Sequence, residues 1–464
     1  MSRSPEAAVK VAVLTAGSLL VTLTLAGCGQ GGDQESDGTV TVWTVETQPD
    51  RVAIQKEAME AWAQESGVEV EVVPVEEDQV SQQVSAAALS GELPDAINAL
   101  SPGIVRAFDR DEYLDRDAAQ QVVEALGEER FSPSALELSS DGDELISVPS
   151  DAWPMLVYYR KDLFAEAGLE PPTTYEALRT AAEQLTTDNR YGITLATDAS
   201  DPFTQQTLEF LAQGNGCELV DDAGAAALDS AACTETIELY ADLAGASSPT
   251  GTQSVDSTRA TYFSGQAAMV VWSSFLLDEL AGLVEEFTPS CAECTDPGWL
   301  AQNTGVVSVV EGPSGGSEAG SYVELTSWAI TDGADPETAD LVEHMMSAGF
   351  VDWLSMAPTG KVPVLTGTSD NPTEYTDAWA GLEMGVDDKA VISDVYPAEV
   401  IDTLAAAPES GRRWALPDHG DILGPIASEL PLAKVAADLG AESVDAAQAQ
   451  QQMQEAVTEI AERD

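Results

Sequence analysis

The fold of this chain is decided by one stretch, residues 143–178, which reads DELISVPSDAWPMLVYYRKDLFAEAGLEPPTTYEAL. The apolar residues from Leu145 to Val148 predict a strand. Pro149 interrupts it, and a second apolar run then continues through Tyr158 and Tyr159. These two tyrosines are consecutive, so they point to opposite faces of a strand, and at least one of them should pack in the interior.

Helices follow these strands directly. The segment KDLFAEAG predicts a short helix that ends at Gly168. The segment EPPTTYEAL predicts the start of another, with either Thr173 or Thr174 as its N-cap. A strand that leads straight into helices is typical of an α/β fold.

The residues before this stretch also alternate strands with helices. TVTVWTVE (39–46) and VEVEVVPV (68–75) have the β-branched content of strands. Between them Ile54, Ala58 and Trp62 share one helical face, so we expect Trp62 in the core. A helix of small residues then leads to GELPDAINAL, a turn into a third short strand. The alternation predicts a mainly parallel sheet covered on both faces.

Three later segments extend the pattern: YFSGQAAMVVWSSFLLDEL (262–280), SYVELTSWAITDGADPETADLVEHMMSAG (321–349) and WLSMAPTGKVPV (353–364). In this order the segments resemble the extracellular solute-binding proteins of bacterial ABC importers, in the large sugar-binding group (family 1) that includes maltose-binding protein. The resemblance runs from Thr39 to about Ala405. It implies an α/β, two-lobe periplasmic-binding-protein fold (type II), with discontinuous lobes joined by a hinge and a solute held between them.

The resemblance also implies where the chain passes between the lobes. The expected boundaries are an N-terminal lobe at 39–148 plus 321–362, a C-terminal lobe at 149–307 plus 366–464, and crossover segments at 308–320 and 363–365. With 464 residues, the chain is long enough for two such lobes.

The first residues have the composition of an export signal. Basic Arg3 and Lys10 border a mostly apolar run, 11–25, that is short for a membrane span. The sequence Leu25-Ala26-Gly27-Cys28 resembles a bacterial lipobox, in which the cysteine is acylated and the chain is cut before it. We therefore predict a lipoprotein signal peptide in 1–27, lipidation at Cys28, a flexible tether in 28–38 and a location on the outer face of the cell membrane. An ordinary signal peptide is the alternative.

The charge of the chain is strongly acidic. Its 19 Lys and Arg residues stand against 81 Asp and Glu residues, for a net charge of −62. Such a surface repels nucleic acid and anionic lipid headgroups, so neither is an expected partner. The carboxylates are spread along the chain, which favours a solvated acidic coat over a patch built for one partner.

Four cysteines follow Cys28, at positions 217, 233, 291 and 294. An even number in an exported chain predicts two disulfides, and three connectivities are open. Sequence proximity favours Cys217–Cys233 and Cys291–Cys294. The CAEC segment has no second CxxC or nearby histidine to complete a zinc site, so we expect neither a metal nor a cofactor.

Sugar sites combine aromatic rings, which stack on the apolar faces of sugars, with polar groups that pair with hydroxyls. By their positions in the resemblance, the candidate ligand contacts are Trp43, Glu46, Thr47, Asp95, Asp151, Trp153, Trp272, Phe275, Trp328 and Tyr396. Each has a simpler alternative: the tryptophans could be core, and the carboxylates could be solvated. Where some relatives carry an acid on the first crossover this chain has Trp153, so a specific sugar preference is not transferred.

The resemblance implies a monomer that delivers a sugar, a disaccharide or an oligosaccharide, to the permease subunits of an importer and that performs no catalysis. The alternative is an exported, tethered hydrolase that acts on glycans or esters. GPSGG (312–316) matches the GxSxG nucleophile pattern, but that pattern needs a strand before Ser314 and a helix after it. Pro313 and the glycines around the serine predict a loop instead. An adhesion protein would show repeats or many short strands, and the sequence has neither.

Overall fold

The structure is a computed structural model that describes residues 38–463. The predicted signal peptide, Cys28 and all of the predicted tether except Gly38 lie outside the described residues. Within the described range, no helix has the length and apolar character needed to span a bilayer.

The first three strands form the parallel part of the sheet. β1 (Thr39–Thr44) lies between β2 (Glu69–Pro74) and β3 (Ala96–Leu100) and is parallel to both. β9 (Ser321–Ile330) continues the sheet beyond β3 but runs antiparallel to it. The prediction of a mainly parallel sheet is therefore correct for these three strands and wrong for the sheet as a whole, because long strands that return from the rest of the chain pair antiparallel.

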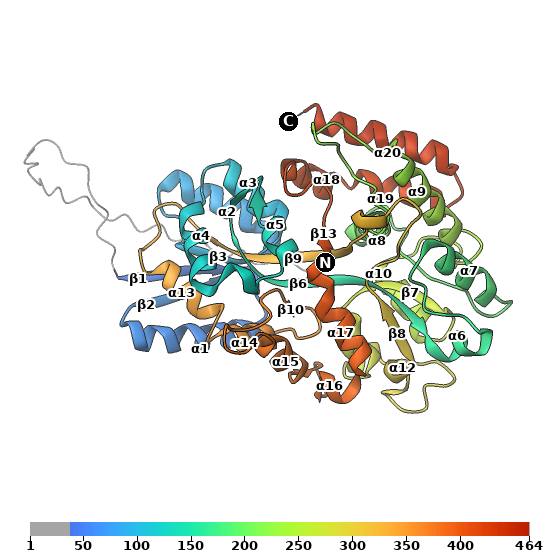
Figure 1. Cartoon of the computed structure of the whole chain (residues 1–464), viewed down its shortest axis with the longest axis horizontal. Coiled ribbons are helices and arrows are strands. Elements are labelled where there is room, and N and C mark those ends of the chain that lie inside the picture. The colour runs from blue at the N-terminus through green and yellow to red at the C-terminus, as the bar shows by residue number, and fades with distance from the viewer. Residues whose placement is uncertain (1–37, 464) are drawn as a thin grey trace, which may run out of the picture. The chain divides into compact units, whose positions relative to one another are not determined.

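β6 (Val148–Arg160) is the longest strand, and it joins two groups of elements (Figure 1). Its first half pairs with β9, and its second half pairs with β7 (Met269–Ser273) and β8 (Thr304–Val307). The second apolar run lies in β6, where the register shift between Pro149 and Asp151 accommodates the proline. The strand predicted from Leu145 to Val148 is wrong, because Leu145 belongs to the short strand β5 (Glu144–Leu145) and only Val148 belongs to β6.

Helices around β1–β3 form what we call the β1 side. They are α1 (Pro49–Ser66), α2 (Glu77–Ser90), α3 (Pro102–Arg110), α4 (Arg116–Leu126), α5 (Pro133–Leu138), α13 (Thr338–Met345) and α14 (Phe350–Ser355). In α1 the predicted face is buried at Ala58 and Trp62, whereas Ile54 is half-buried. Val40 and Val42 of β1 pack in one apolar cluster and Trp43 packs against another, so this part of the sheet is covered on both faces as predicted.

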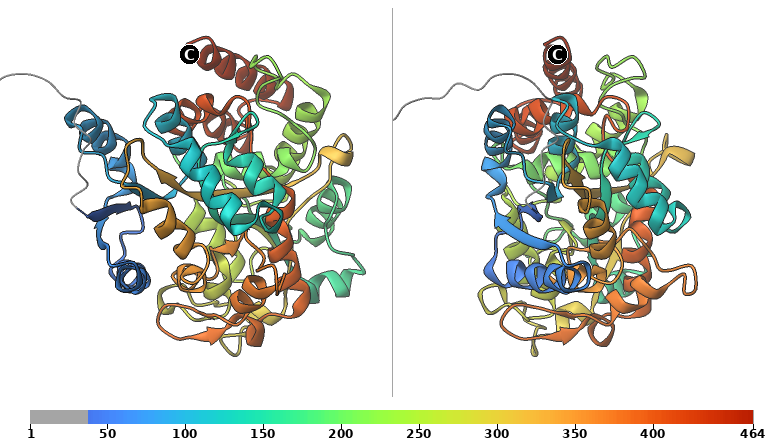
Figure 2. Two further views of the ribbon diagram at one scale, coloured as in Figure 1. Left: turned by 60° about the vertical axis from the view of Figure 1, so that its left-hand side comes forward. Right: turned by 90° about the vertical axis from the view of Figure 1, so that its left-hand side faces the viewer.

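The elements around β7 and β8 form the β7 side. Its helices include α6 (Lys161–Ala167), α7 (Tyr175–Leu185), α8 (Pro202–Gln213), α9 (Ala231–Ala244), α10 (Val255–Phe263), α11 (Leu276–Leu280), α12 (Trp299–Gln302), α17 (Ala398–Ala406), α19 (Pro431–Gly440) and α20 (Ala446–Ala461). Thr174 caps α7, because its hydroxyl accepts from the amide of Ala177 at 3.1 Å. The C-terminal helices α19 and α20 pack on α8 and α9 (Figure 2).

The chain returns to the β1 side along β9. The loop 308–320, expected as a crossover, stays on the β7 side, where Gly312 and Gly320 bond to Gly214 and Gln213 at the end of α8. Residues 366–380, expected in the second lobe, pack on the β1 side, since the ring of Tyr375 in α15 (Glu374–Ala380) meets Phe350 at 5.0 Å. β10 (Val362–Pro363) pairs with the middle of β6.

The chain then passes through short elements to its C-terminal part: β11 (Glu383–Met384), β12 (Ala390–Val391), α16 (Ile392–Val395), β13 (Gly411–Arg412) and α18 (Leu423–Glu429). β13 pairs with the start of β9. The four cysteines pair as proximity favours, Cys217 with Cys233 and Cys291 with Cys294.

Candidate functional site

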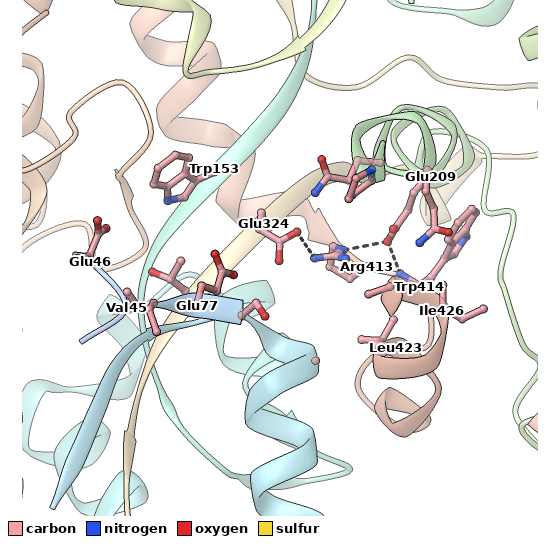
Figure 3. Close-up of a pocket in the computed structure, with 18 of the residues that line it drawn as sticks. Val45, Glu46, Glu77, Trp153, Glu209, Glu324, Arg413, Trp414, Leu423 and Ile426 are labelled. Atoms are coloured by element: carbon pink, nitrogen blue, oxygen red, sulfur yellow. Dashed lines mark hydrogen bonds and ion pairs between the residues drawn. The ribbon is translucent and has the colours of Figure 1, made fainter. Parts of the chain in front are cut away.

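A cavity of about 500 Å³ lies where elements of the β1 side and the β7 side meet (Figure 3). The β1 side contributes the residues that follow β1 and β3 and the start of α2, and the β7 side contributes α8. The middle of β9, Trp153 of β6 and the C-terminal segment 413–430 complete the wall. The lining residues are Val45, Glu46, Thr47, Gln48, Arg51, Glu77, Ala99, Ser101, Gly103, Trp153, Pro202, Gln205, Gln206, Glu209, Glu324, Thr326, Arg413, Trp414, Leu423, Ile426, Ala427 and Leu430.

The topology explains this location. β1 and β3 are parallel, so the loops after their carboxyl ends open at the same edge of the sheet. β6 and β9 pass beside that edge on their way between the two sides. A site at this point therefore draws residues from both sides at once.

Two tryptophans line this cavity, the buried Trp414 and the more exposed Trp153. The side chain of Trp153 is half-buried, and Phe275 stacks on it with centroids 4.9 Å apart and planes 23° apart. Gly360 fits closely against the indole, where a Cβ would come within 2.6 Å of a ring atom. The indole Nε1 donates to Asp151 Oδ2 at 2.9 Å. These neighbours fix the orientation of the ring at the cavity wall.

A buried lysine links the cavity to the core behind it. Lys361 has no exposed surface, and its Nζ lies 2.8 Å from Glu46 Oε1 and 3.4 Å from Asp151 Oδ1. The indole of Trp353 lies 4.4 Å from the same ammonium group, and its Nε1 donates to Asp151 Oδ1 at 2.7 Å. Asp151 is itself fully buried, and its donors hold it in the core.

Glu46 is held ionised in this arrangement. Burial alone would raise the pKa of Glu46, but the charges of Lys361 and Arg51 outweigh it and lower that pKa from 4.5 to about 2. Arg51 Nη1 contacts Glu46 Oε2 at 2.7 Å.

Glu46 should therefore stabilise the fold above the pKa it has in the unfolded chain, and this stabilisation should fade as pH falls from about 4.5 toward 2. This pKa shift corresponds to a contribution of about 3 kcal/mol to the free energy of unfolding. We expect Glu46→Gln to unfold more easily than the wild type near neutral pH, with the difference shrinking steadily in acid. Urea unfolding over a series of pH values measures this, and a difference independent of pH would contradict it.

A second ion-pair network forms the opposite wall. The guanidinium of Arg413 contacts Glu209 Oε1 at 3.0 Å and Glu324 Oε2 at 2.7 Å (Figure 3). Glu209 also accepts from the amide of Trp414 at 2.8 Å, and Tyr322 donates to Glu324 at 2.8 Å. Burial raises the pKa of Glu209 in spite of the arginine. The network fastens the C-terminal segment to α8 and β9.

The structure brings only some of the predicted contacts to the cavity. Glu46, Thr47 and Trp153 line it. Phe275 and Asp151 lie directly behind Trp153, and neither is part of the lining.

The other predicted contacts lie elsewhere. Trp43 packs against the apolar cluster beside β3, and Trp272 is buried against Phe203 with its Nε1 bonded to Val255. Trp328 and Tyr396 are core residues. Trp328 packs on Trp353, and the hydroxyl of Tyr396 donates to the carbonyl of Leu277.

Asp95 precedes β3, at the end of the strand opposite to Ser101 of the cavity lining. Its two oxygens accept from the backbone amides of Thr41 and Asp335 at 2.6 and 2.7 Å. The structure therefore gives its side chain a role in joining the ends of strands.

Several lining residues carried no recognisable signal in the sequence. They are Arg51, Glu77, Gln205, Gln206, Glu209, Glu324, Arg413 and Trp414. Gln205 and Glu209 lie one turn apart on α8, and this spacing could have indicated a shared polar face. The C-terminal segment lies beyond Ala405, where the resemblance ends, and its return to the cavity depends on the tertiary structure.

A family model described as bacterial extracellular solute-binding protein matches residues 46–282. The chain belongs to this family. The match confirms the family predicted from the sequence. The solute-binding protein is also 26% identical over 366 residues to YcjN of Escherichia coli (strain K12), a protein assigned as an ABC transporter periplasmic-binding protein; the alignment covers 77% of this chain and 79% of that one.

Solved structures share the fold. A cyclo/maltodextrin-binding protein complexed with maltotetraose matches with a TM-score of 0.67 and 14% identity, over 92% of this chain and 98% of that one. A sugar transporter from Arthrobacter chlorophenolicus A6 with bound laminaribiose matches with a TM-score of 0.63 and 15% identity. The match covers 91% of this chain and 99% of that one. These likenesses confirm the predicted α/β, two-lobe fold.

Proposed function

We propose that this solute-binding protein captures a carbohydrate, either a disaccharide or an oligosaccharide, in the cavity and delivers it unchanged to the permease subunits of an ABC importer. The observation that carries the proposal is Trp153, an indole held at the wall of a cavity that also presents amide, hydroxyl and carboxylate side chains. An indole offers a surface for the apolar face of a sugar ring, and amides, hydroxyls and carboxylates pair with its hydroxyls. The ligands of the solved relatives, maltotetraose and laminaribiose, support this class.

The proposal includes closure of two lobes on the solute. A ligand that touches both the β1 side and the β7 side gains contacts only when the two sides are close, and this difference shifts the balance toward the closed form. β6 and β9, which connect the sides, would then act as the hinge. In this proposal the two lobes are the β1 side, which includes residues 366–380, and the β7 side, which includes residues 308–320, and the protein acts as a monomer.

Thermal unfolding of the protein in the presence of each sugar of a panel tests the proposal. Ligand at about 100 times its dissociation constant should stabilise the protein by about 2.7 kcal/mol. A panel of neutral disaccharides and oligosaccharides in which no member raises the melting temperature would contradict a carbohydrate ligand.

The hydrolase alternative has little support in the geometry. Ser314 of the GPSGG segment donates to Glu235 at 2.8 Å, and a 3-10 turn of three residues (Gly316–Glu318) follows it in place of a helix. We therefore propose that the protein is not an enzyme. In the variant Ser314→Ala, sugar binding should be unchanged, and loss of an esterase activity in that variant would support the alternative.

Export and anchoring complete the proposal. Lipidation at Cys28 would hold the protein at the outer face of the membrane, beside its permease. Labelling cells with a fatty acid should mark the wild type and leave Cys28→Ala unmarked, and equal label in both would exclude this cysteine as the anchor.

A further inference from the structure

The positive charges that line the cavity are already paired. Arg51 contacts Glu46 at 2.7 Å, and Arg413 contacts Glu209 and Glu324 at 3.0 and 2.7 Å. A guanidinium held by carboxylates at these distances has little attraction left for an anion. An anionic group of a ligand would have to displace a carboxylate of the protein.

The cavity also holds a carboxylate with no counter-ion. Glu77 lies in the first turn of α2 and faces the cavity with Glu324 (Figure 3), and the structure shows no ion pair to it among residues 38–463. Desolvation and the nearby carboxylates of Glu324 and Glu46 raise the pKa of Glu77. Counting Glu46, Glu77, Glu209 and Glu324 against Arg51 and Arg413, the lining carries more negative than positive charge.

Gln205 supplies an acceptor that points to the chemistry of the ligand. The residue is 9% exposed, it lines the cavity from α8, and its Oε1 is buried without a hydrogen-bond partner in the described part of the chain. A buried acceptor without a partner is unfavourable. Oε1 is shielded in this structure, so the side chain must rotate to bring it to the cavity surface. There a ligand hydroxyl or N–H group could satisfy it, whereas an ionised carboxylate, sulfate or phosphate has no proton to donate.

We infer that the cavity selects saccharides without acidic groups, with Gln205 accepting a hydrogen bond from the sugar and Glu77 repelling anionic substituents. This inference rests on the proposed function and adds the class of saccharide to it. Burial of an anion beside the unpaired carboxylate of Glu77 is unfavourable, because Arg51 and Arg413 are already paired with other carboxylates. A neutral or amine-bearing sugar meets no such penalty.

Titration calorimetry with a matched ligand set tests this selection. The set consists of a neutral oligosaccharide that binds, its uronic acid derivative and the corresponding uronamide, which has nearly the same shape without the charge. We expect the uronamide to bind like the neutral sugar and the uronate to bind roughly 100-fold more weakly. Equal binding of the uronate, or equal rejection of uronamide and uronate, would overturn the inference and leave the proposed function intact. Binding of no saccharide at all would refute the proposed function itself.

Two variants assign the selection to residues. Glu77→Gln should reduce the preference for uronamide over uronate by about tenfold, the effect of removing one nearby charge worth about 1.4 kcal/mol. Glu76→Gln, its neighbour outside the cavity lining, should leave the preference unchanged. Gln205→Leu should lower the affinity for the neutral sugar by about tenfold. An unchanged preference in Glu77→Gln, or unchanged affinity in Gln205→Leu, would exclude that residue from the selection.

Discussion

Replacement of Lys361 by methionine is expected to destabilise the protein by about 3–5 kcal/mol, the usual cost of removing one partner from a buried ion pair. Lys361 has no exposed surface and lies between Glu46 and Asp151, so its loss leaves two buried carboxylates without this charge. Urea unfolding near neutral pH measures the loss. A destabilisation below about 1 kcal/mol, the scale of a surface ion pair, would contradict the central role of this lysine.

A matched control and a double variant sharpen this test. Lys161→Met removes a lysine that is partly exposed and lies 3.9 Å from Glu399, so it should have little effect. In the double variant Asp151→Asn, Lys361→Met, the buried charge opposite the missing ammonium is also removed. We expect the free energy of unfolding to fall less in the double variant than the sum of its falls in the two single variants, because the two groups interact directly. Additive losses would show that they do not.

Replacement of Trp153 by alanine is expected to weaken binding of the sugar by about 30- to 100-fold, since truncation of a central aromatic contact commonly costs 2 kcal/mol or more. The variant should also melt earlier without ligand, because the stacking on Phe275 and the hydrogen bond to Asp151 are lost. Affinity is therefore measured by calorimetry at a temperature where the variant is folded.

Trp299→Ala is the control for this loss. Trp299 in α12 is also half-buried, and it packs against the guanidinium of Arg160, outside the cavity lining. Its removal should leave the affinity unchanged. Equal loss of affinity in both variants would mean that the effect is on overall stability, and unchanged affinity in Trp153→Ala would exclude this ring as a sugar contact.

Local sequence patterns predicted the elements well because they depend on neighbouring residues. Thr174 and Gly168 mark helix ends, and Trp62 lies in the core as its helical spacing indicates. The direction of strand pairing was predicted less well. It depends on where β6 and β9 return in space, and no short pattern encodes that return.

Only some residues of the candidate site could be predicted, because the others reach the cavity through the tertiary structure. Position in the family resemblance led to Glu46 and Thr47, which line the cavity. It also suggested Trp328 and Trp272, which are buried in the interior. Whether a side chain faces the cavity or the core depends on register. Arg413 and its neighbours reach the cavity through a long return of the chain, so sequence order could not reveal them.

Native mass spectrometry of the full chain mixed with neutral oligosaccharides tests the central claim most directly. The account predicts a complex of one protein and one oligosaccharide, from which the sugar is released with its mass unchanged. A spectrum without a complex, or release of shorter sugars that were absent from the mixture, would contradict capture of an unaltered carbohydrate.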